Sequence, residues 1–482
     1  MPHPAFTAFR NSLGTPDVIG AGIIGDGLPV PGPFGPHPLV YADYVASGRA
    51  LTLVEDFMRD QVLPWYANTH TETSHCGAIT TALREAARAE IALGTGATAD
   101  HAVIFAGSGA TTGLNRLVHL LGVDRAVARG DRPVVILGPY EHHSNLLPWR
   151  ESGADVIELA EAPDGGPDLA QLARVLDATE GRALRIGAFS AASNVTGILT
   201  DTVAVARMLR ARGVLTVWDY ACAAPYTAID MAPGTDHAKD AVVFSAHKFL
   251  GGPGASGVLI LRRDAIRATT PSQPGGGTVR FVSPWGQDYA LDPVAREEAG
   301  TPNILGDIRA GLAMAVKRAA GQAMLDRRHA ELSDRALAAW AGNPAIEVLG
   351  KPGADRLPIF SLRIRDPRGG GWLHPQLVTR MLSDGWGIQA RGGCACAGPY
   401  GHRLMGIDQA HSDQLRRAIL AGDETVKPGW TRLNLSAFLT EAKADFIIGA
   451  VDSLARAPYP LADAYVIDPT TAHVALKAGH AA

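Results

Sequence analysis

Residues 241–257, AVVFSAHKFLGGPGASG, place a lysine between an apolar run and a glycine-rich segment. The apolar part has the composition of a buried β-strand, and Lys248 follows it within four residues. Lysine is among the residues least often buried in proteins. Lys248 is therefore either a surface cation on a strand-to-loop turn or an amine with a chemical role. The remainder of the chain distinguishes the two.

The same pattern of an apolar run followed by polar residues recurs through the first half of the chain. These runs alternate with Ala-, Leu- and Arg-rich segments of helical periodicity. The runs are HAVIFAG (101–107), RPVVILG (132–138), LRIGAFSAAS (184–193), VLTVWDYAC (214–222), DAVVFSAH (240–247) and GVLILRR (257–263). Alternation of this kind predicts βαβ units and a mostly parallel sheet. Ligands of such sheets bind outside the carboxyl ends of the strands, where the polar residues of this chain fall.

The length of 482 residues predicts more than one domain. Residues 1–38 are rich in Pro and Gly and are predicted to form an N-terminal arm. Residues 39–306 contain the alternating strands and helices of a large domain. Residues 307–482 are predicted to form a long linking helix at 307–343, followed by a small α+β domain that includes a strand-like run at 387–393.

The composition excludes several classes of protein. The net charge of −4 gives no sign of binding to nucleic acid or to an acidic membrane. No apolar run approaches the roughly 20 residues of a membrane span, and the N-terminal segment lacks the features of a secretory signal. The four cysteines are too few for a disulfide framework in a chain of this length. We therefore expect a cytoplasmic protein.

Asp219 and Lys248 together predict the cofactor. Asp219 follows an apolar run, where a carboxylate is costly unless it meets a cation or strong hydrogen-bond donors. For Asp219 alone, a helix N-cap is the simpler interpretation. Lys248 lies one strand further along the chain, however. A carboxylate and a lysine at neighbouring strand ends form the pair needed by pyridoxal 5′-phosphate (PLP), whose aldehyde reacts with the amine and whose ring nitrogen the Asp keeps protonated.

Two further stretches support a phosphate-bearing cofactor. FAGSGATTGLN (105–115) combines a strand, a glycine turn and a helix start, which favours anion binding, although a tight turn alone would look the same. Ser245 and His247 add donors beside Lys248. YEHHSN (140–145) supplies two histidines at another strand end, and an imidazole stacked on the PLP ring is a plausible use of one of them. A zinc site there is disfavoured, because adjacent side chains point apart and no matching ligand set is evident.

The C-terminal part adds a thiol loop and an arginine. ARGGCACAGPYGHR (390–403) holds Cys394 and Cys396 near Arg391, and a nearby cation lowers a thiol pKa and favours a nucleophile. Half of a metal site is the alternative, with little support because a second cysteine pair is lacking. Arg432 lies in a strand-like run and suits recognition of a substrate carboxylate, with a surface salt bridge as its alternative.

Taken together, SAHK with GGPGASG, SNVTG, WDYA, YEHHSNLLPW, EEAGTPN and the Arg–Cys–Ala loop resemble class V PLP-dependent aminotransferases. Within that family they are most similar to the cysteine desulfurase and selenocysteine lyase branch, from about residue 40 to about residue 450. The resemblance implies the type I PLP-dependent aminotransferase fold, with a mostly parallel seven-stranded sheet between helices in a large domain and a smaller α+β C-terminal domain. It also implies a homodimer with active sites at the interface.

The resemblance further implies a role for each site residue. Lys248 forms the Schiff base and removes the substrate α-proton, Asp219 contacts the ring nitrogen, and His142 stacks on the ring. Asn194 lies near the phenolic oxygen. The residues that match the phosphate site are Ala110, Thr111, Ser245 and His247, with Thr278 reaching it from the second subunit.

On the substrate side, Arg432 matches the arginine that binds the substrate α-carboxylate, and Arg391 lies beside the thiol loop. Cys396 matches the cysteine that takes the sulfur as a persulfide. The implied reaction releases sulfur from L-cysteine or a related amino acid to Cys396. The acceptor that receives the sulfur afterwards is not implied, and no metal site is expected.

Three residues depart from the pattern of the branch. Cys222 stands where the branch has a glutamine, Tyr220 replaces a glycine, and Cys394 stands in the position of a histidine, which makes the loop similar also to that of molybdenum-cofactor sulfurases. Other PLP reactions therefore remain open, namely C–S bond cleavage, epimerisation or β-decarboxylation in specialised biosynthesis. A non-catalytic PLP-binding protein for sulfur transfer or regulation is a further alternative.

Overall fold

The chain forms two compact units in a computed structural model that describes residues 3–69 and 71–478. The first unit consists of residues 1–23, 47–192 and 200–324, and the second of residues 24–46, 193–199 and 325–482. The chain therefore contributes two short segments to the second unit before its C-terminal part completes that unit. Each unit has its own sheet and its own hydrophobic core.

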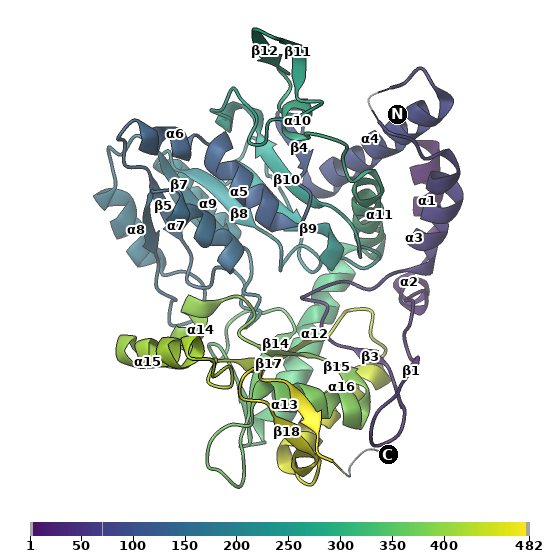
Figure 1. Ribbon diagram of the computed structural model, residues 1–482, viewed down its shortest axis with the longest axis vertical. Coiled ribbons are helices and arrows are strands. Elements are labelled where there is room, and N and C mark those ends of the chain that lie inside the picture. The colour runs from purple at the N-terminus through teal and green to yellow at the C-terminus, as the bar shows by residue number, and fades with distance from the viewer. Residues whose placement is uncertain (1–2, 70, 479–482) are drawn as a thin grey trace. The chain divides into compact units, whose positions relative to one another are not determined.

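The first unit is built on a seven-stranded sheet in the order β4-β10-β9-β8-β7-β5-β6 (Figure 1). Strands β9, β8, β7, β5 and β6 pair in parallel, and β10 runs antiparallel to both β9 and β4. The strands are β4 (His101–Phe105), β5 (Val134–Leu137), β6 (Asp155–Glu158), β7 (Arg185–Ser190), β8 (Leu215–Asp219), β9 (Ala241–Ser245) and β10 (Gly257–Arg262). The predicted mostly parallel, seven-stranded sheet is confirmed.

Helices flank this sheet, which explains why its central strands are apolar on both faces (Figure 1). All four residues of β5 and all five of β9 are buried. The helices that follow the strands are α5 (Ala110–Leu120), α6 (Val123–Ala128), α7 (Leu147–Glu151), α8 (Leu169–Ala178) and α9 (Thr202–Ala211). Leu114, Leu117 and Trp149 from these helices share one core cluster with the strand residues Val135 and Leu137.

A second group of helices in this unit packs around the close contact of α4 (His75–Thr95) with α11 (Ile304–Ala320). Gly311 of α11 lies so near Ala87 of α4 that an added Cβ would be 2.5 Å from the Ala87 Cα. Arg84 joins the same helices through Asp307, with Nε to Oδ2 at 2.7 Å. The group also contains α1 (Pro4–Ser12), α2 (Pro16–Ala21) and α3 (Thr52–Phe57), whereas the short α10 (Pro293–Glu297) contacts β4.

The predicted linking helix at 307–343 is wrong as a single helix. Helix α11 ends at Ala320, and α12 (Gln322–Ala341) begins after Gly321. Gly321 has φ of +80° and ψ of +125°, a backbone conformation that only glycine adopts readily. An Ala/Arg-rich helical pattern on both sides of this glycine concealed the break. Within residues 3–69 and 71–478, no helix is long and apolar enough to cross a membrane.

The second unit contains a four-stranded antiparallel sheet in the order β13-β14-β17-β16. Its strands are β13 (Ile346–Val348), β14 (Ile359–Ile364), β16 (Arg391–Gly393) and β17 (Trp430–Asn434). Its helices besides α12 are α13 (Pro375–Trp386), α14 (Gly398–Leu404), α15 (Gln409–Leu420) and α16 (Glu441–Arg456). Trp340 of α12 packs edge-on against Phe360 of β14, with ring centroids 5.1 Å apart, in the core of this unit.

Three two-stranded pairs complete the second unit. They are β1 (Pro29–Val30) with β2 (His37–Pro38), β3 (Val40–Tyr41) with β15 (Ile388–Gln389), and β18 (Tyr465–Ile467) with β19 (Val474–Leu476). The predicted strand at 387–393 is therefore divided. Ile388–Gln389 pairs in parallel with β3, whereas Arg391–Gly393 pairs with β17, so one strand-like stretch supplies two different sheets.

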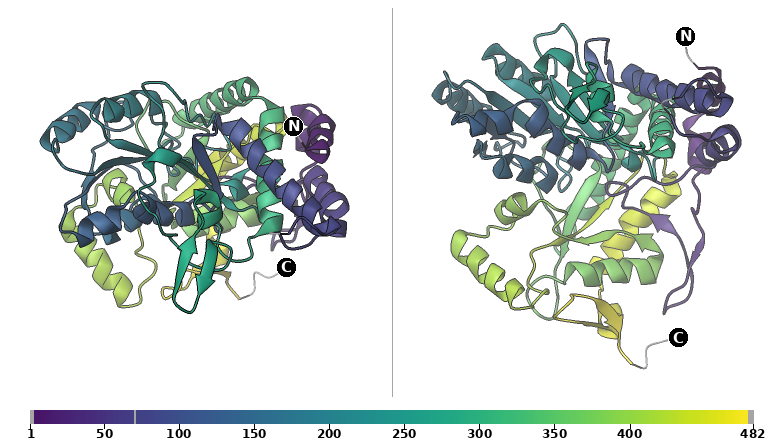
Figure 2. Two further views of the ribbon diagram at one scale, coloured as in Figure 1. Left: turned by 90° about the horizontal axis from the view of Figure 1, so that it is seen from above. Right: turned by 45° about the horizontal axis from the view of Figure 1, so that its top comes forward.

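A hairpin of the first unit stands out from the rest of that unit (Figures 1 and 2). It consists of β11 (Val279–Ser283) and β12 (Gly286–Tyr289). It carries several exposed large apolar side chains, with Trp285 at 91% and Val282 at 62% of full exposure. Exposed apolar side chains gathered on one projecting hairpin favour association with another protein surface.

The close contact of α4 and α11 predicts an asymmetric effect of two glycine-to-alanine changes. Gly311→Ala forces the helices apart and should lower the free energy of unfolding by about 1–3 kcal/mol. Gly449→Ala lies on the exposed side of α16 with nothing within 4 Å, so it should raise that free energy by about 0.5–1 kcal/mol. Urea unfolding of both variants measures this; equal effects would show that the helix contact is not tight.

Candidate active site

In the first unit, Lys248 ends a short 3-10 helix (Ala246–Lys248) that directly follows β9. Close backbone approaches fix this turn. Gly48 donates its N–H to the His247 carbonyl at 2.9 Å, and a Cβ on Gly48 would lie 1.8 Å from the Phe249 oxygen. A Cβ on Gly252 would lie 2.0 Å from the Ala246 oxygen. The glycines therefore allow the close backbone approaches that fix the turn at Lys248.

Asp219 is the last residue of β8, which pairs in parallel with β9. The residue is 4% exposed, and its Oδ1 accepts a hydrogen bond from Ala221 N at 2.7 Å. A turn follows, so Asp219 is not a helix N-cap. Burial raises the pKa of the Asp219 carboxyl, while the hydrogen bond from Ala221 and the positive charge of Lys248 lower it. The predicted Asp–Lys pair therefore lies at one edge of the sheet and interacts electrostatically.

The predicted phosphate residues meet where β4 and β9 lead into their loops. Ala110 opens α5 and donates its N–H to the Ser245 hydroxyl at 2.9 Å. A Cβ on Gly109 would lie 2.9 Å from the Ser245 Oγ and 3.2 Å from the His247 Cε1. Ser245, His247 and the start of α5 are thus brought together around a glycine that leaves room for them. Burial, with the nearby Lys248 charge, lowers the pKa of His247, so its imidazole is neutral at pH 7.

Three other predicted cofactor residues have hydrogen-bond partners within the first unit. The Thr111 hydroxyl lies 2.7 Å from the Ser144 hydroxyl. Thr278 is buried, and its hydroxyl donates to the Gly275 carbonyl at 2.6 Å, just before the β11–β12 hairpin. His142 accepts a hydrogen bond from Ser144 N at 3.1 Å on its Nδ1, which fixes the orientation of its ring.

Glu141, which the sequence did not single out, organises this edge of the sheet. Its carboxylate accepts hydrogen bonds from the Ser190 N–H at 2.9 Å, the Ser190 hydroxyl at 2.6 Å and the Asn145 amide at 2.6 Å. It thereby joins the loop after β5 to the end of β7, just before His142. Burial raises the pKa of Glu141 to about 7, and the Asp219 charge adds to that rise against the hydrogen bonds. The YEHHSN motif drew attention to its histidines, which are half-buried, although its glutamate is buried.

Glu141 predicts a specific pH dependence of stability. Its pKa in the folded protein exceeds the usual value of about 4.3, so the folded state retains the proton to higher pH than the unfolded state. The stabilisation that Glu141 contributes is complete below about pH 4 and is lost as the pH rises to about 7, by at most about 3 kcal/mol. The side-chain amide of Glu141→Gln does not titrate, so this pH-dependent contribution is missing from that variant.

The difference in free energy of unfolding between the natural protein and Glu141→Gln should therefore fall from pH 5 to pH 7, measured by urea unfolding at each pH. Asp219 titrates in both proteins, so its effect largely cancels. A difference that is independent of pH would show that Glu141 is ionised throughout.

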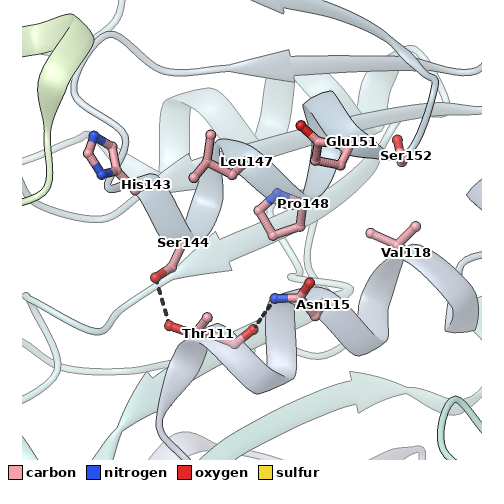
Figure 3. Close-up of a pocket in the computed structure, with 9 residues that line it drawn as sticks. All are labelled: Thr111, Asn115, Val118, His143, Ser144, Leu147, Pro148, Glu151 and Ser152. Carbon is pink, nitrogen blue, oxygen red and sulfur yellow. Dashed lines mark hydrogen bonds between the residues drawn. The ribbon is translucent and has the colours of Figure 1, made fainter. Parts of the chain in front are cut away.

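A cavity of about 490 Å³ lies beside this region (Figure 3). Its walls come from α5 and from the segment that leads through α7, and the Thr111 and Ser144 hydroxyls face each other across its floor. Its other lining residues are Asn115, Val118, His143, Leu147, Pro148, Glu151 and Ser152. Lys248 and Asp219 do not line it, so it is separate from the Asp–Lys pair.

In the second unit, one carboxylate holds both predicted substrate arginines. Arg391 and Arg432 lie directly opposite each other in the β16–β17 pairing. Asp43 accepts from Arg391 Nε at 2.9 Å on one oxygen and from Arg432 Nη2 at 3.0 Å on the other. Arg432 is 4% exposed, which rules out a surface salt bridge. Within residues 3–69 and 71–478, its buried Nε has no hydrogen-bond partner, so it remains able to bind an acceptor such as a carboxylate.

Asn194 connects Arg432 to the cysteine loop. Its backbone carbonyl accepts from Arg432 Nη1 at 3.1 Å, and its side-chain amide donates to the Ala395 carbonyl at 2.7 Å. The Asn194 Oδ1 is buried and lacks a hydrogen-bond partner in the part of the chain that the structure describes. Sequence reasoning placed Asn194 near the cofactor but did not predict its contact with the loop that carries the thiols.

The loop itself is a tight turn with both thiols exposed. The Ala397 N–H donates to the Cys394 carbonyl at 3.3 Å across Ala395 and Cys396, whose φ angles are +52° and +55°. Residues other than glycine adopt such angles at a cost, and they do so mainly at functional sites. Asn194 holds the turn from outside.

The residues of the first unit fit PLP. The buried Asp219 carboxylate interacts with the charge of Lys248. The carboxylate suits the ring nitrogen of PLP, and the amine suits its aldehyde. The Ser245 hydroxyl accepts from Ala110 N, and no hydrogen bond in the described part of the chain uses its own proton, so it can donate to a phosphate oxygen. The space at Gly109, which a Cβ would fill, leaves room for such a group.

Comparisons with known proteins agree with this geometry. The family model for class-V aminotransferases matches residues 40–418. The chain belongs to the class V aminotransferase family. Members of this family are PLP-dependent enzymes, so this chain is one as well, and the resemblance predicted from the sequence is confirmed.

Several relatives are similar over most of the chain. A cysteine desulfurase of Dickeya dadantii (strain 3937) is 31% identical over 368 residues, which cover 75% of this chain and 84% of the relative. A probable cysteine desulfurase of Streptomyces coelicolor is 28% identical over 369 residues, which cover 75% of this chain and 84% of the relative.

Solved structures show the same fold. The apo structure of a cysteine desulfurase from Thermococcus onnurineus NA1 aligns with a TM-score of 0.70 at 22% identity, covering 87% of this chain and 95% of that one. The S-sulfonic acid form of the Escherichia coli cysteine desulfurase CsdA aligns with a TM-score of 0.69 at 24% identity. The alignment covers 91% of this chain and 98% of that one. The predicted type I fold is confirmed.

Proposed function

We propose that this protein is a cysteine desulfurase-like enzyme that removes sulfur from L-cysteine or a closely related amino acid and takes it up on Cys396. One observation carries the proposal. Cys396 is exposed on a strained turn that Asn194 tethers, and the same asparagine binds Arg432, which has an unpartnered buried Nε. A nucleophilic thiol and a carboxylate-binding arginine therefore belong to one connected group. The names of the relatives support the same reaction.

The first unit would hold the cofactor. Lys248 would bind it covalently through its amine, Asp219 would contact its ring nitrogen, and Ser245, His247 and the start of α5 would bind its phosphate. When bound, PLP supplies an electron sink that stabilises negative charge on the substrate α-carbon. His142 is the candidate for contact with the ring face.

The chain's own residues would carry the remaining steps. Arg432 would bind the substrate carboxylate through its guanidinium, which Asp43 holds in place. The Lys248 amine would take the α-proton of the substrate. The Cys396 thiolate would then attack the substrate sulfur. An S–S bond forms, the Cβ–S bond breaks, and its electron pair stays on the carbon skeleton, which leaves as alanine after protonation.

Replacement of Cys396, with Cys76 as the control, tests this proposal. Cys396→Ser should abolish the transfer of sulfur from L-cysteine, measured as alanine formed and as sulfide released in the presence of dithiothreitol. Cys76→Ser, at another free cysteine outside the proposed site, should retain both. Equal alanine and sulfide from Cys396→Ser would refute the thiol mechanism. Pyruvate, racemised amino acid or decarboxylated product instead of alanine would favour the other PLP reactions, and no product from any amino acid would favour a binding protein.

The exposed hairpin supports a homodimer, and the free thiols suit a reducing compartment such as the cytoplasm. Besides Trp285 and Val282, Phe281 is 58% exposed and Leu291 is 79% exposed. We propose that this apolar surface is covered by a second copy of the chain.

Trp285→Glu should therefore shift sedimentation from dimer to monomer, because it places a charge in an apolar interface. Val466→Glu changes an exposed apolar residue of the β18–β19 hairpin, 51% exposed, and should leave the dimer intact. A dimer that persists in Trp285→Glu would place the interface elsewhere.

A further inference from the structure

Two thiols share the turn that follows β16, although the proposed reaction uses only one. Cys394 opens the turn and Cys396 is its third residue. Positive φ at both central positions, Ala395 and Cys396, gives the tight left-handed turn that also joins β-hairpins. Because Asn194 holds the Ala395 carbonyl, the turn has a fixed place in its unit.

The geometry of such a turn brings the two sulfur atoms within reach of each other. Consecutive Cα atoms are about 3.8 Å apart, so residues two apart around a turn are separated by well under about 7.6 Å. Cysteines whose Cα atoms are about 4.4–6.8 Å apart can join their sulfur atoms. Rotation about the side-chain bonds of Cys394 and Cys396 therefore suffices to pass a sulfur atom between them.

The two thiols differ in their surroundings. Cys394 lines a cavity of about 440 Å³ in the second unit, whereas Cys396 does not. Such a volume is enough for a small ligand. Apolar side chains, among them Met405, Ile419 and Trp430, form much of the wall. The Trp430 indole N–H is buried and has no hydrogen-bond partner among the described residues, so an acceptor atom of a ligand would satisfy it.

The charged groups of the cavity largely cancel. Lys427 pairs with Glu424, and both line the cavity. Burial lowers the pKa of His374, so this lining imidazole is neutral at pH 7. His402 is occupied by the Gly398 carbonyl and the Ser412 hydroxyl. The cavity therefore suits an uncharged ligand with an apolar body.

We propose that Cys394 is a second sulfur-carrying thiol, which takes the outer sulfur from Cys396 and passes it to a small apolar thiol bound in this cavity. The inference rests on the proposed function, since that reaction loads Cys396. The Cys394 thiolate attacks the outer sulfur of the Cys396 persulfide. A new S–S bond forms on Cys394, the old one breaks, and its electron pair returns to the Cys396 sulfur as a thiolate.

The second transfer follows the same chemistry. The thiolate of the bound ligand attacks the outer sulfur on Cys394 and leaves as a persulfide, while the Cys394 thiolate is restored. Each thiol gives up one proton as it attacks, and each released thiolate can take one up. No oxidant or reductant is needed at either step.

Mass spectrometry of the holoenzyme tests the first transfer. After one turnover with L-cysteine and rapid alkylation, fragmentation of the loop peptide should locate one added sulfur atom first on Cys396 and later on Cys394. Cys394→Ser should keep the sulfur on Cys396, and Cys396→Ser should carry none. Both the natural protein and Cys394→Ser should form alanine in that turnover.

Transfer to benzyl mercaptan, an apolar thiol, tests the cavity. Ile419→Trp places a larger side chain at the cavity wall and should lose this transfer, as should Cys394→Ser. Leu420→Trp changes the next residue, which is 71% exposed and does not line the cavity, and should retain it. First-turnover alanine should be the same in all three variants.

Three outcomes would overturn the relay. Sulfur that stays on Cys396 in the natural protein, with equal transfer by Cys394→Ser, shows that Cys394 carries none. A Cys394–Cys396 disulfide with released sulfide shows attack on the inner sulfur instead. Full transfer by Ile419→Trp shows that the cavity does not bind the acceptor. Absence of both alanine and added sulfur would instead refute the proposed function beneath it.

Discussion

The parallel pairing of β8 with β9 is the constraint on which the first unit's chemistry depends. Trp218 lies opposite Val242 and Asp219 opposite Val243, so the two strands end at the same edge of the sheet. A carboxylate buried to 4% exposure is tolerable only with compensation, which comes from the Ala221 N–H and from the charge of Lys248. A slip of this register would separate the carboxylate from the amine. Glycine is required at Gly48 and Gly252, because backbone atoms of the Lys248 turn occupy the space that a side chain would need.

The second unit uses one carboxylate for a similar purpose. Asp43 binds two arginines that the β16–β17 register sets opposite each other, and it offsets one of their two positive charges. Without Asp43, two guanidinium groups would face each other near a buried strand, which is costly. Among the residues that the structure describes, the buried Nε–H of Arg432 has no hydrogen-bond partner. Two arginines and one carboxylate leave a net positive charge, so the site offers both a charge and a donor to an anionic group.

The sequence was most informative where strand ends and chemistry coincide. Apolar runs followed by Asp219, by Lys248 or by the start of α5 predicted both the sheet and the side chains at its edge. Glu141 and Asp43 were missed because their importance comes from burial and long-range contacts, which no local pattern encodes. The break at Gly321 and the division of the strand at 387–393 were missed for another reason. One glycine weakens a helical pattern only slightly. A strand-like stretch does not specify the strand with which each of its residues pairs.

The interleaving of the two units along the chain bears on the order of folding during synthesis. Strand β3, at residues 40–41, pairs with β15 at residues 388–389, and Asp43 binds an arginine 389 positions later. A ribosome that makes about 5–20 residues per second would need tens of seconds to supply those partners. The nascent segment 24–46 must wait that long while the first unit's strands can already assemble. Segment 24–46 therefore lacks its native partners during most of the synthesis of the chain.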